Sequence, residues 1–163
     1  MISSSSGPTT RLARFLDRLI RPLFKRVNNT ETWLSSGADF IQRFELYTME
    51  PGRIGPNTKF VTLKINNLST MLPHDGVATA MNHFLSAHIP WNRIENLTFE
   101  TVQCLTELFL QNNLFFYNGK IYRHVKGCPN SLPFSETLTK IYLLFWRTPL
   151  TNVLESKQEF FAR

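Results

Sequence analysis

Cysteine and histidine are scarce in this sequence of 163 residues, and they do not occur at the spacings typical of metal sites. Its two cysteines, Cys104 and Cys128, form neither a disulfide framework nor a metal-ligand spacing. The four histidines are His74, His83, His88 and His124. No HExxH motif occurs among them. We therefore expect histidines that pack or lie at the surface, and reduced thiols in an intracellular protein of the nucleus or cytoplasm.

Several signature motifs of enzymes and membrane proteins are missing too. There is no Walker A phosphate loop, no GxGxxG fingerprint and no GxSxG nucleophile elbow, so hydrolase and dinucleotide-binding functions lack support. No apolar run is long enough to cross a bilayer. The sequence has instead 42% hydrophobic residues and 14 phenylalanines, which predict one compact domain with an aromatic-rich core.

Acidic residues are almost missing from the first 27 residues. One acid, Asp17, stands against six basic residues, a balance of +5, whereas the whole chain carries +6. The six are Arg11, Arg14, Arg18, Arg21, Lys25 and Arg26. After a flexible lead over residues 1–10, apolar residues recur at helical spacing between these cations. This pattern predicts an amphipathic helix that is capped by Thr9 or Thr10 and kinked or divided at Pro22.

Three interpretations of this basic helix remain open. It is a core-packing helix with a solvated basic face, or a helix that contacts a nucleic-acid backbone. The third interpretation is a mitochondrial presequence, because the segment is rich in arginine and serine and nearly free of acids. The rest of the chain, with a balance of +1, has no comparable concentration of positive charge.

Hydrophobic periodicity and turn residues predict a mixture of helices and strands in the remaining chain. The predicted helices, in chain order, cover residues 30–47, 76–87, 99–112, 134–146 and 154–161. Asp75 and Thr98 are the expected N-caps of the second and third of these helices. The β-forming residues of 58–65 predict a strand. Cys104 falls in the apolar stripe of its helix, so we expect it to be buried and inert.

Residues 115–146 combine three kinds of element in a short space. Asn118-Gly119 lies between two short apolar runs and predicts a type I′ hairpin. A loop rich in Gly, Pro, Asn and Ser follows at residues 127–133, where we expect Cys128 to be exposed. Helical spacing begins at Phe134. The stretch therefore predicts a hairpin, a tight loop and a helix in immediate succession.

Three segments resemble the Penelope-like type of reverse transcriptase, and they follow one another along the chain in the order found in that family. The loop and helix are similar to its G-x-P-M-G-S-P-x-S-P…A-x-I-Y, with matches at Gly127, Pro129, Pro133, Ser135, Ile141 and Tyr142. The hairpin is similar to N-x-F-x-F-x-G-x-x-Y, with matches at Asn113, Phe115, Gly119 and Tyr122. Residues 60–76 resemble F-D-V-x-S-L-Y-T-N-I-P-x-E-x-G, with matches at Leu68, Thr70, Pro73 and Gly76. The resemblance implies an α+β fold, with helix-rich fingers and a partial palm over residues 11–163.

The catalytic residues of that family are not matched. The family holds two Mg²⁺ ions with carboxylates on its palm strands, but Lys64 stands at the position of the first aspartate. No acid occurs between Glu50 and Asp75 that could replace it. The family's Y-x-D-D hairpin is expected directly after Arg163, where the sequence ends. The resemblance therefore implies no bound Mg²⁺ and no DNA synthesis.

A surface facing nucleic acid or nucleotide is still expected. Ser69 takes the place of the residue that screens the sugar 2′ position in the family, and Asn130 and Ser131 replace the Met-Gly of the loop. The residues expected to face nucleic acid are Arg11, Arg14, Arg18, Arg21, Lys25, Arg26, Ser69, Lys120, Arg123, His124, Lys126, Gly127, Asn130 and Ser131.

The predicted function is that of a degenerate, retroelement-derived domain that binds RNA or DNA but does not polymerise it. One alternative is a protein-interaction module that binds a partner, or a second copy of itself, through an uncovered palm surface. The other is a mobile-element remnant without a function. A membrane is not among the expected partners.

Overall fold

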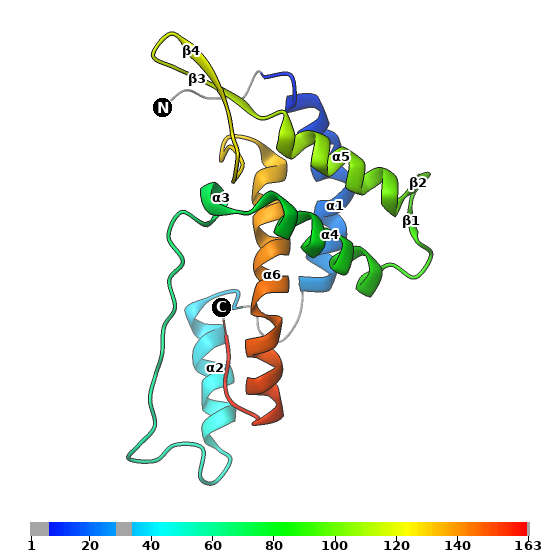
Figure 1. Ribbon diagram of the computed structural model, residues 1–163. Helices are drawn as coiled ribbons and strands as arrows, with labels where there is room; N and C mark the ends of the chain where they lie inside the picture. The colour runs from blue at the N-terminus through cyan, green and yellow to red at the C-terminus, as the bar shows by residue number, and fades with distance from the viewer. Residues whose placement is uncertain (1–6, 29–33, 163) are drawn as a thin grey trace. The chain divides into compact units, whose positions relative to one another are not determined.

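The computed structural model describes residues 7–28 and 34–162, which form helices and two small antiparallel sheets (Figure 1). This mixture agrees with the predicted α+β class. The chain divides into two compact units. The first contains residues 1–27 and 66–147, and the second contains residues 28–65 and 148–163. Among the described helices, none is long and apolar enough to cross a membrane.

The first unit begins with the predicted basic helix, α1 (Thr10–Asn28). Its buried stripe consists of Ala13, Leu16, Leu19, Ile20 and Phe24. The helix continues through Pro22, so the expected division there does not occur. Pro22 is exposed, which leaves the packed stripe of the helix undisturbed. Packing of this apolar stripe therefore outweighs the single hydrogen bond that a proline removes.

Two further helices, α4 (His74–His88) and α5 (Phe99–Gln111), pack on this core. The expected cap at Thr98 is confirmed, because its side chain accepts a hydrogen bond from the Thr101 N–H. The expected cap at Asp75 is wrong. The N-cap of α4 is Pro73, and Asp75 lies in the first turn, where its charge favours the helix N-terminus. Between the two helices, β1 (Arg93–Ile94) pairs with β2 (Leu97–Thr98).

The predicted hairpin is formed by β3 (Leu114–Tyr117) and β4 (Lys120–Arg123). Asn118 has φ 47° and Gly119 has φ 75°, the positive values that a type I′ turn requires. The pairing register joins Phe115 to Tyr122 and Tyr117 to Lys120. The hairpin prediction is therefore confirmed, with the turn at the predicted residues Asn118 and Gly119.

The last helix, α6 (Pro133–Ser156), is longer than the sequence pattern predicted. It contains Pro149 and runs past residue 146, and it ends at Ser156, so the separate helix expected at 154–161 is wrong. Its first part belongs to the first unit, where the Phe134 ring meets the Phe109 ring edge-on at 5.4 Å. Residues from 148 onward belong to the second unit.

The second unit is built around α2 (Gly37–Thr48) and an aromatic cluster. Ser36 caps α2 by accepting from the Asp39 N–H at 3.2 Å. The rings that meet within 6.5 Å of one another are those of Phe40, Phe44, Tyr47, Phe60 and Phe160. The predicted helix started at residue 30, and residues 30–33 lie outside the described part of the chain.

The strand predicted at residues 58–65 is wrong. These residues do not form a strand, and within the described chain no backbone hydrogen bond joins 59–65 to a neighbour. Val61 is 77% exposed and Leu63 is 71% exposed. The sequence has the β-forming side chains, but a strand also needs a paired neighbour, and the described residues supply none.

Candidate nucleic-acid interface

Two segments that carry the family resemblance meet at Gly127. Its N–H donates to the Leu72 carbonyl at 2.7 Å, and the next N–H, of Cys128, donates to the Ser69 carbonyl at 2.8 Å. Gly127 has φ 73°, and a Cβ built there would overlap the backbone of Thr70. Only glycine permits both this φ and this approach of the two chains. The sequence pattern therefore brings residues 69–72 against 127–128.

We call the contact between residues 69–72 and 127–128 the junction. His74 also belongs to it. Its Nε2 lies 3.0 Å from the Gly127 carbonyl oxygen, a hydrogen bond that it makes as the donor. The ring joins the start of α4 to the loop that precedes α6. His74 is therefore a packing histidine, as expected from the absence of metal-site spacing.

The two cysteines lie opposite to their predicted environments. Cys104 is exposed on α5, and Cys128 is buried at the junction. The Cys128 Sγ lies 3.8 Å from the Ser69 carbonyl and 3.9 Å from the Ser135 carbonyl. Burial raises the pKa of the Cys128 thiol. Cys128 is therefore an inert packing residue, because the thiolate that reacts as a nucleophile is disfavoured.

The residues expected to face a nucleotide have mixed exposure. Ser69 is half-buried and Gly127 is buried, whereas Asn130 and Ser131 are exposed in the loop before α6. Lys64, at the family's first aspartate position, is exposed in the second unit. Among the described residues, no group of three histidine, cysteine, aspartate or glutamate side chains could hold a metal ion.

One face of α1 is a basic surface. Its exposed cations are Arg11, Arg14, Arg18, Lys25 and Arg26. Within the described chain, none of these five forms an ion pair. We call these five residues the α1 basic face. The sequence predicted this surface through charge balance and helical spacing alone.

Arg21 has a different role from the α1 basic face. Its Nε lies 2.9 Å from an Asp17 carboxylate oxygen, and its Nη2 donates to the Pro133 carbonyl at 3.3 Å. The other Asp17 oxygen accepts from the Thr137 hydroxyl at 2.6 Å. Arg21 and Asp17 therefore join α1 to α6. These contacts within the first unit compete with the nucleic-acid contact that was expected of Arg21.

The hairpin supplies a second set of cations. Lys120, Arg123 and Lys126 are exposed, and the structure places them on β4 and just beyond it. His124 is half-buried, with its ring centroid 4.8 Å from that of Phe115. Burial lowers the pKa of His124, and the nearby His74 lowers it further. The His124 ring, beside the hairpin, is therefore mainly uncharged at neutral pH.

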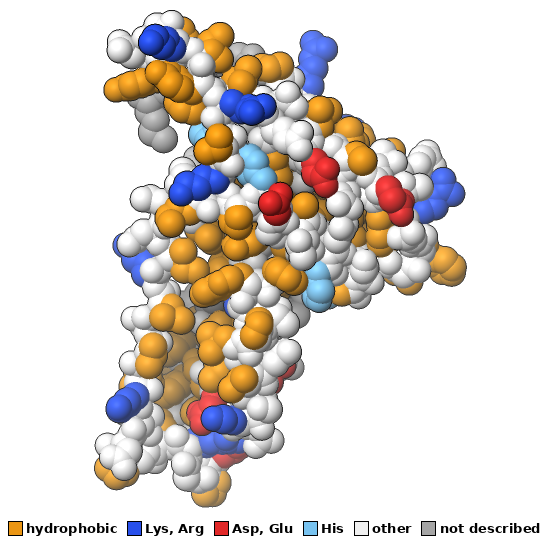
Figure 2. Space-filling model, viewed as in Figure 1, with side chains coloured by type: hydrophobic (Ala, Val, Ile, Leu, Met, Phe, Trp, Pro, Cys, Tyr) orange, Lys and Arg blue, Asp and Glu red, His pale blue; other side chains and the backbone are white. Residues whose placement is uncertain are grey.

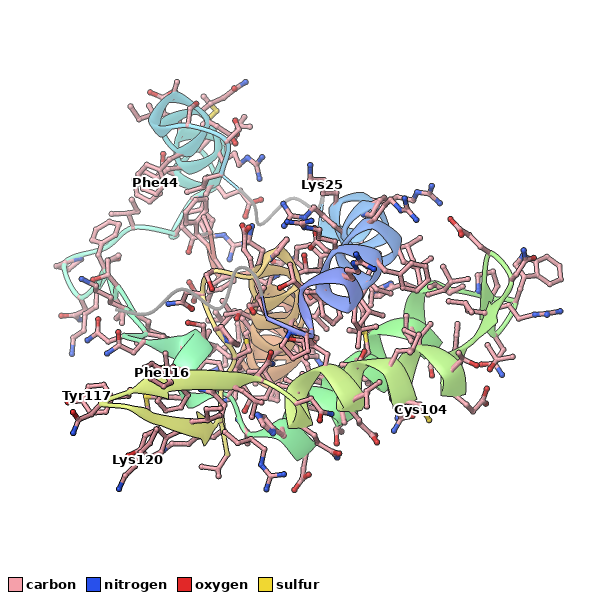
Figure 3. All side chains as sticks on the ribbon, turned by 90° about the horizontal axis from the view of Figure 1, so that it is seen from above. Lys25, Phe44, Cys104, Phe116, Tyr117 and Lys120 are labelled. Carbon is pink, nitrogen blue, oxygen red and sulfur yellow. The ribbon has the colours of Figure 1, made fainter. Side chains whose placement is uncertain are left out.

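The basic residues do not form one continuous surface. Figure 3 shows Lys25 of α1 and Lys120 of the hairpin on opposite sides of α6. At the hairpin, hydrophobic and basic side chains lie next to one another on the surface (Figure 2). Sequence reasoning singled out these cations but missed the exposed tyrosines, Tyr117 and Tyr122. The signal was available, because strand alternation places both on the face that carries Lys120.

No family model matches the sequence, no curated protein is significantly similar to it, and no solved structure matches its fold.

Proposed function

We propose that the chain is a nucleic-acid-binding domain related to reverse transcriptases that does not polymerise DNA. The observation that carries the proposal is the α1 basic face. Five exposed cations on one helix, without an ion pair to any described residue, make a strong local positive potential. Phosphate backbones are the natural partners of such a surface, because binding releases their condensed counterions.

The junction at Gly127 supports the relationship to reverse transcriptases. The resemblance rests on short matches in residues 60–76 and 127–142, which lie far apart in the sequence. The contact between Thr70 and Gly127 brings parts of these segments together, and it depends on a matched glycine. Matched residues that meet in space are better support for a shared architecture than matched residues that do not.

The proposed lack of polymerase activity rests on the segment that the resemblance aligns with the family's first palm strand. Two-metal phosphoryl transfer needs carboxylates that hold the ions at the attacking and leaving oxygens. Lys64 places a positive charge at the matching position, and a cation repels Mg²⁺. The segment between Glu50 and Asp75 offers no replacement acid. A primer-extension assay with Mg²⁺ or Mn²⁺ should therefore give no product, and templated synthesis that a Lys64 substitution abolishes would contradict this.

Salt-dependent binding tests the proposal directly. We expect the affinity for a fluorescent single-stranded oligonucleotide to fall steeply as salt rises. Changing Arg11, Arg14 and Arg18 together to glutamine should reduce the slope of log K against log salt by about 2, at about 0.7 for each phosphate contact.

A charge-matched variant controls for net charge. Changing Lys59, Lys64 and Lys157 to glutamine removes the same charge from exposed positions of the second unit. This control should keep most of the salt slope. Wild-type protein that does not bind, or that binds with no salt dependence, would contradict the proposed function.

A second candidate function, self-association, is favoured by residues 59–65. This segment has no backbone hydrogen bond among the described residues and exposes Val61, Leu63 and Ile65, which would share one face if it formed a strand. A second copy can pair with it antiparallel about Leu63, which places Val61 opposite Ile65 of the other copy. In that register Lys59 lies opposite Asn67 and Lys64 lies opposite Thr62, so no like charges stand directly opposite each other, and the two copies of Lys64 are diagonal neighbours.

A further inference from the structure

The two faces of the β3–β4 hairpin differ in chemistry. Residues directly opposite each other in an antiparallel pair share a face. The pairs Phe115–Tyr122 and Tyr117–Lys120 therefore form one face, which we call the aromatic face. The other face carries the pairs Leu114–Arg123 and Phe116–Ile121. One face thus presents aromatic rings beside a lysine, and the other presents mainly aliphatic surface beside an arginine.

The rings of the aromatic face form a connected series. Phe115 and Tyr122 stack with centroids 5.4 Å apart and an angle of 20° between the rings. Tyr117 continues the series, with its centroid 6.5 Å from that of Tyr122. Tyr117 is 66% exposed and Tyr122 is 42% exposed, so two rings of the series remain open to a partner. The Phe115 ring also contacts the His124 ring, with centroids 4.8 Å apart.

The charge around these rings has one sign. Residues 108–135 contain no aspartate or glutamate, and they contain Lys120, Arg123 and Lys126. Lys120 stands opposite Tyr117 on the aromatic face. The chemistry that fits is an anion that also carries flat rings. Single-stranded nucleic acid has both, because its phosphates are charged and its bases are free to stack.

We propose that the aromatic face binds single-stranded nucleic acid, with bases stacked on Tyr117 and Tyr122 and a phosphate held by Lys120. The inference deepens the proposed function and rests on it. A duplex fits this face poorly, because its bases are already stacked on one another and hide their flat surfaces. The hairpin therefore supplies a preference for single strands, whereas the α1 basic face binds any phosphate backbone.

The first experiment removes one ring at a time. Binding of an oligo(dT) probe is measured by fluorescence anisotropy for wild-type protein and for Tyr117→Ala and Tyr122→Ala. Each change should weaken binding about tenfold, the usual loss for one base–ring stack. The salt slope should not change, because no charge is removed. Tyr117→Phe keeps the ring and should bind like wild-type protein.

The matched control lies on the opposite face of the same strands. Phe116→Ala and Ile121→Ala remove exposed apolar side chains without touching the aromatic face. Both should bind oligo(dT) within about twofold of wild-type protein, the additivity error of unrelated sites. Equal losses at Phe116 and Tyr117 would overturn the assignment, since they would indicate general damage to the hairpin.

The second experiment changes the ligand and leaves the protein unaltered. An abasic strand of equal length has the same phosphates but no rings, so wild-type protein should bind it less tightly than oligo(dT). Tyr117→Ala should bind the two strands more nearly alike. Salt-dependent binding with no preference for bases, or equal binding of duplex, would overturn this inference and leave the proposed function standing. No binding at all would overturn both.

Discussion

At the scale of single residues, Gly127 matters because two separate constraints exclude a side chain there. Its φ of 73° disfavours any side chain, and a Cβ would overlap the Thr70 backbone. Backbone overlap cannot be relieved by rotating a side chain, so the junction itself must move. The same two N–H donors that fix the loop, those of Gly127 and Cys128, would move with it.

We therefore expect Gly127→Ala to lower the free energy of unfolding by about 2–4 kcal/mol. Urea denaturation followed by circular dichroism measures the change. Gly119→Ala is the matched control, because Gly119 also has a positive φ, 75°, but has no atom within 4 Å of its Cβ position. Its cost should be about 1 kcal/mol, from backbone strain alone. Equal costs at the two glycines would contradict the importance of the contact with Thr70.

At the scale of elements, the hairpin and its histidine predict a dependence on pH. Burial lowers the pKa of His124 below its ordinary value, and His74 adds to the effect. Lys120, Arg123 and Lys126 are the nearby charged groups of the hairpin and its exit. Protonation is then less favourable in the folded than in the unfolded protein. Stability is complete above the unfolded pKa of about 6.5 and is lost as pH falls through the lower folded value.

His124→Asn should therefore flatten the loss of stability between pH 7 and pH 5. Thermal unfolding of both proteins at several pH values measures the difference. His83→Asn is a useful control, because His83 is exposed on α4 and contacts the Phe145 ring instead. A pH profile that stays the same in His124→Asn would show that another group causes the loss.

The elements also show what the sequence could and could not reveal. The hairpin turn was predicted at the correct residues, because Asn118 and Gly119 encode the turn locally. The structure of residues 58–65 was predicted wrongly. Their side chains favour a strand, but a strand also depends on pairing with a segment that is distant in the sequence. Cys128 was misplaced for the same reason. A loop residue is expected to be exposed, but tertiary contacts, among them those with the Ser69 and Ser135 carbonyls, bury Cys128.

The same distinction between local signals and long-range contacts applies to the candidate site. The α1 basic face follows from helical periodicity and charge, both of which are local, and all five of its cations are exposed as expected. The role of Arg21 depends on Pro133 and Asp17, and a contact across the chain with Pro133 leaves no local signal. The separation of Lys25 from Lys120 is likewise a property of the fold, on which charge balance gives no information.

At the scale of the whole molecule, the second candidate function predicts a symmetric pair of chains. If residues 59–65 pair about Leu63, a cysteine at that position meets its own copy across the two-fold axis. Leu63→Cys, combined with Cys104→Ser to remove the exposed native thiol, should form a disulfide-linked dimer under mild oxidation. Non-reducing electrophoresis measures its yield, which should persist in high salt.

Position 59 provides the control for that pairing. Lys59→Cys in the same background lies four residues from Leu63, so its copy would be about 27 Å away in the paired chains. It should form little disulfide. Equal cross-linking at residues 59 and 63 would indicate random collision and would contradict the proposed register.

The contact between Asp17 and Thr137 has a consequence for how the protein is made. The two residues are 120 positions apart in the sequence, and their contact joins α1 to α6 within the first unit. At a synthesis rate of about 5–20 residues per second, α1 leaves the ribosome roughly 6–24 s before its partner on α6. During that interval its apolar stripe has no α6 to cover it. We therefore expect the core of the first unit to be completed only after residue 137 has been synthesised.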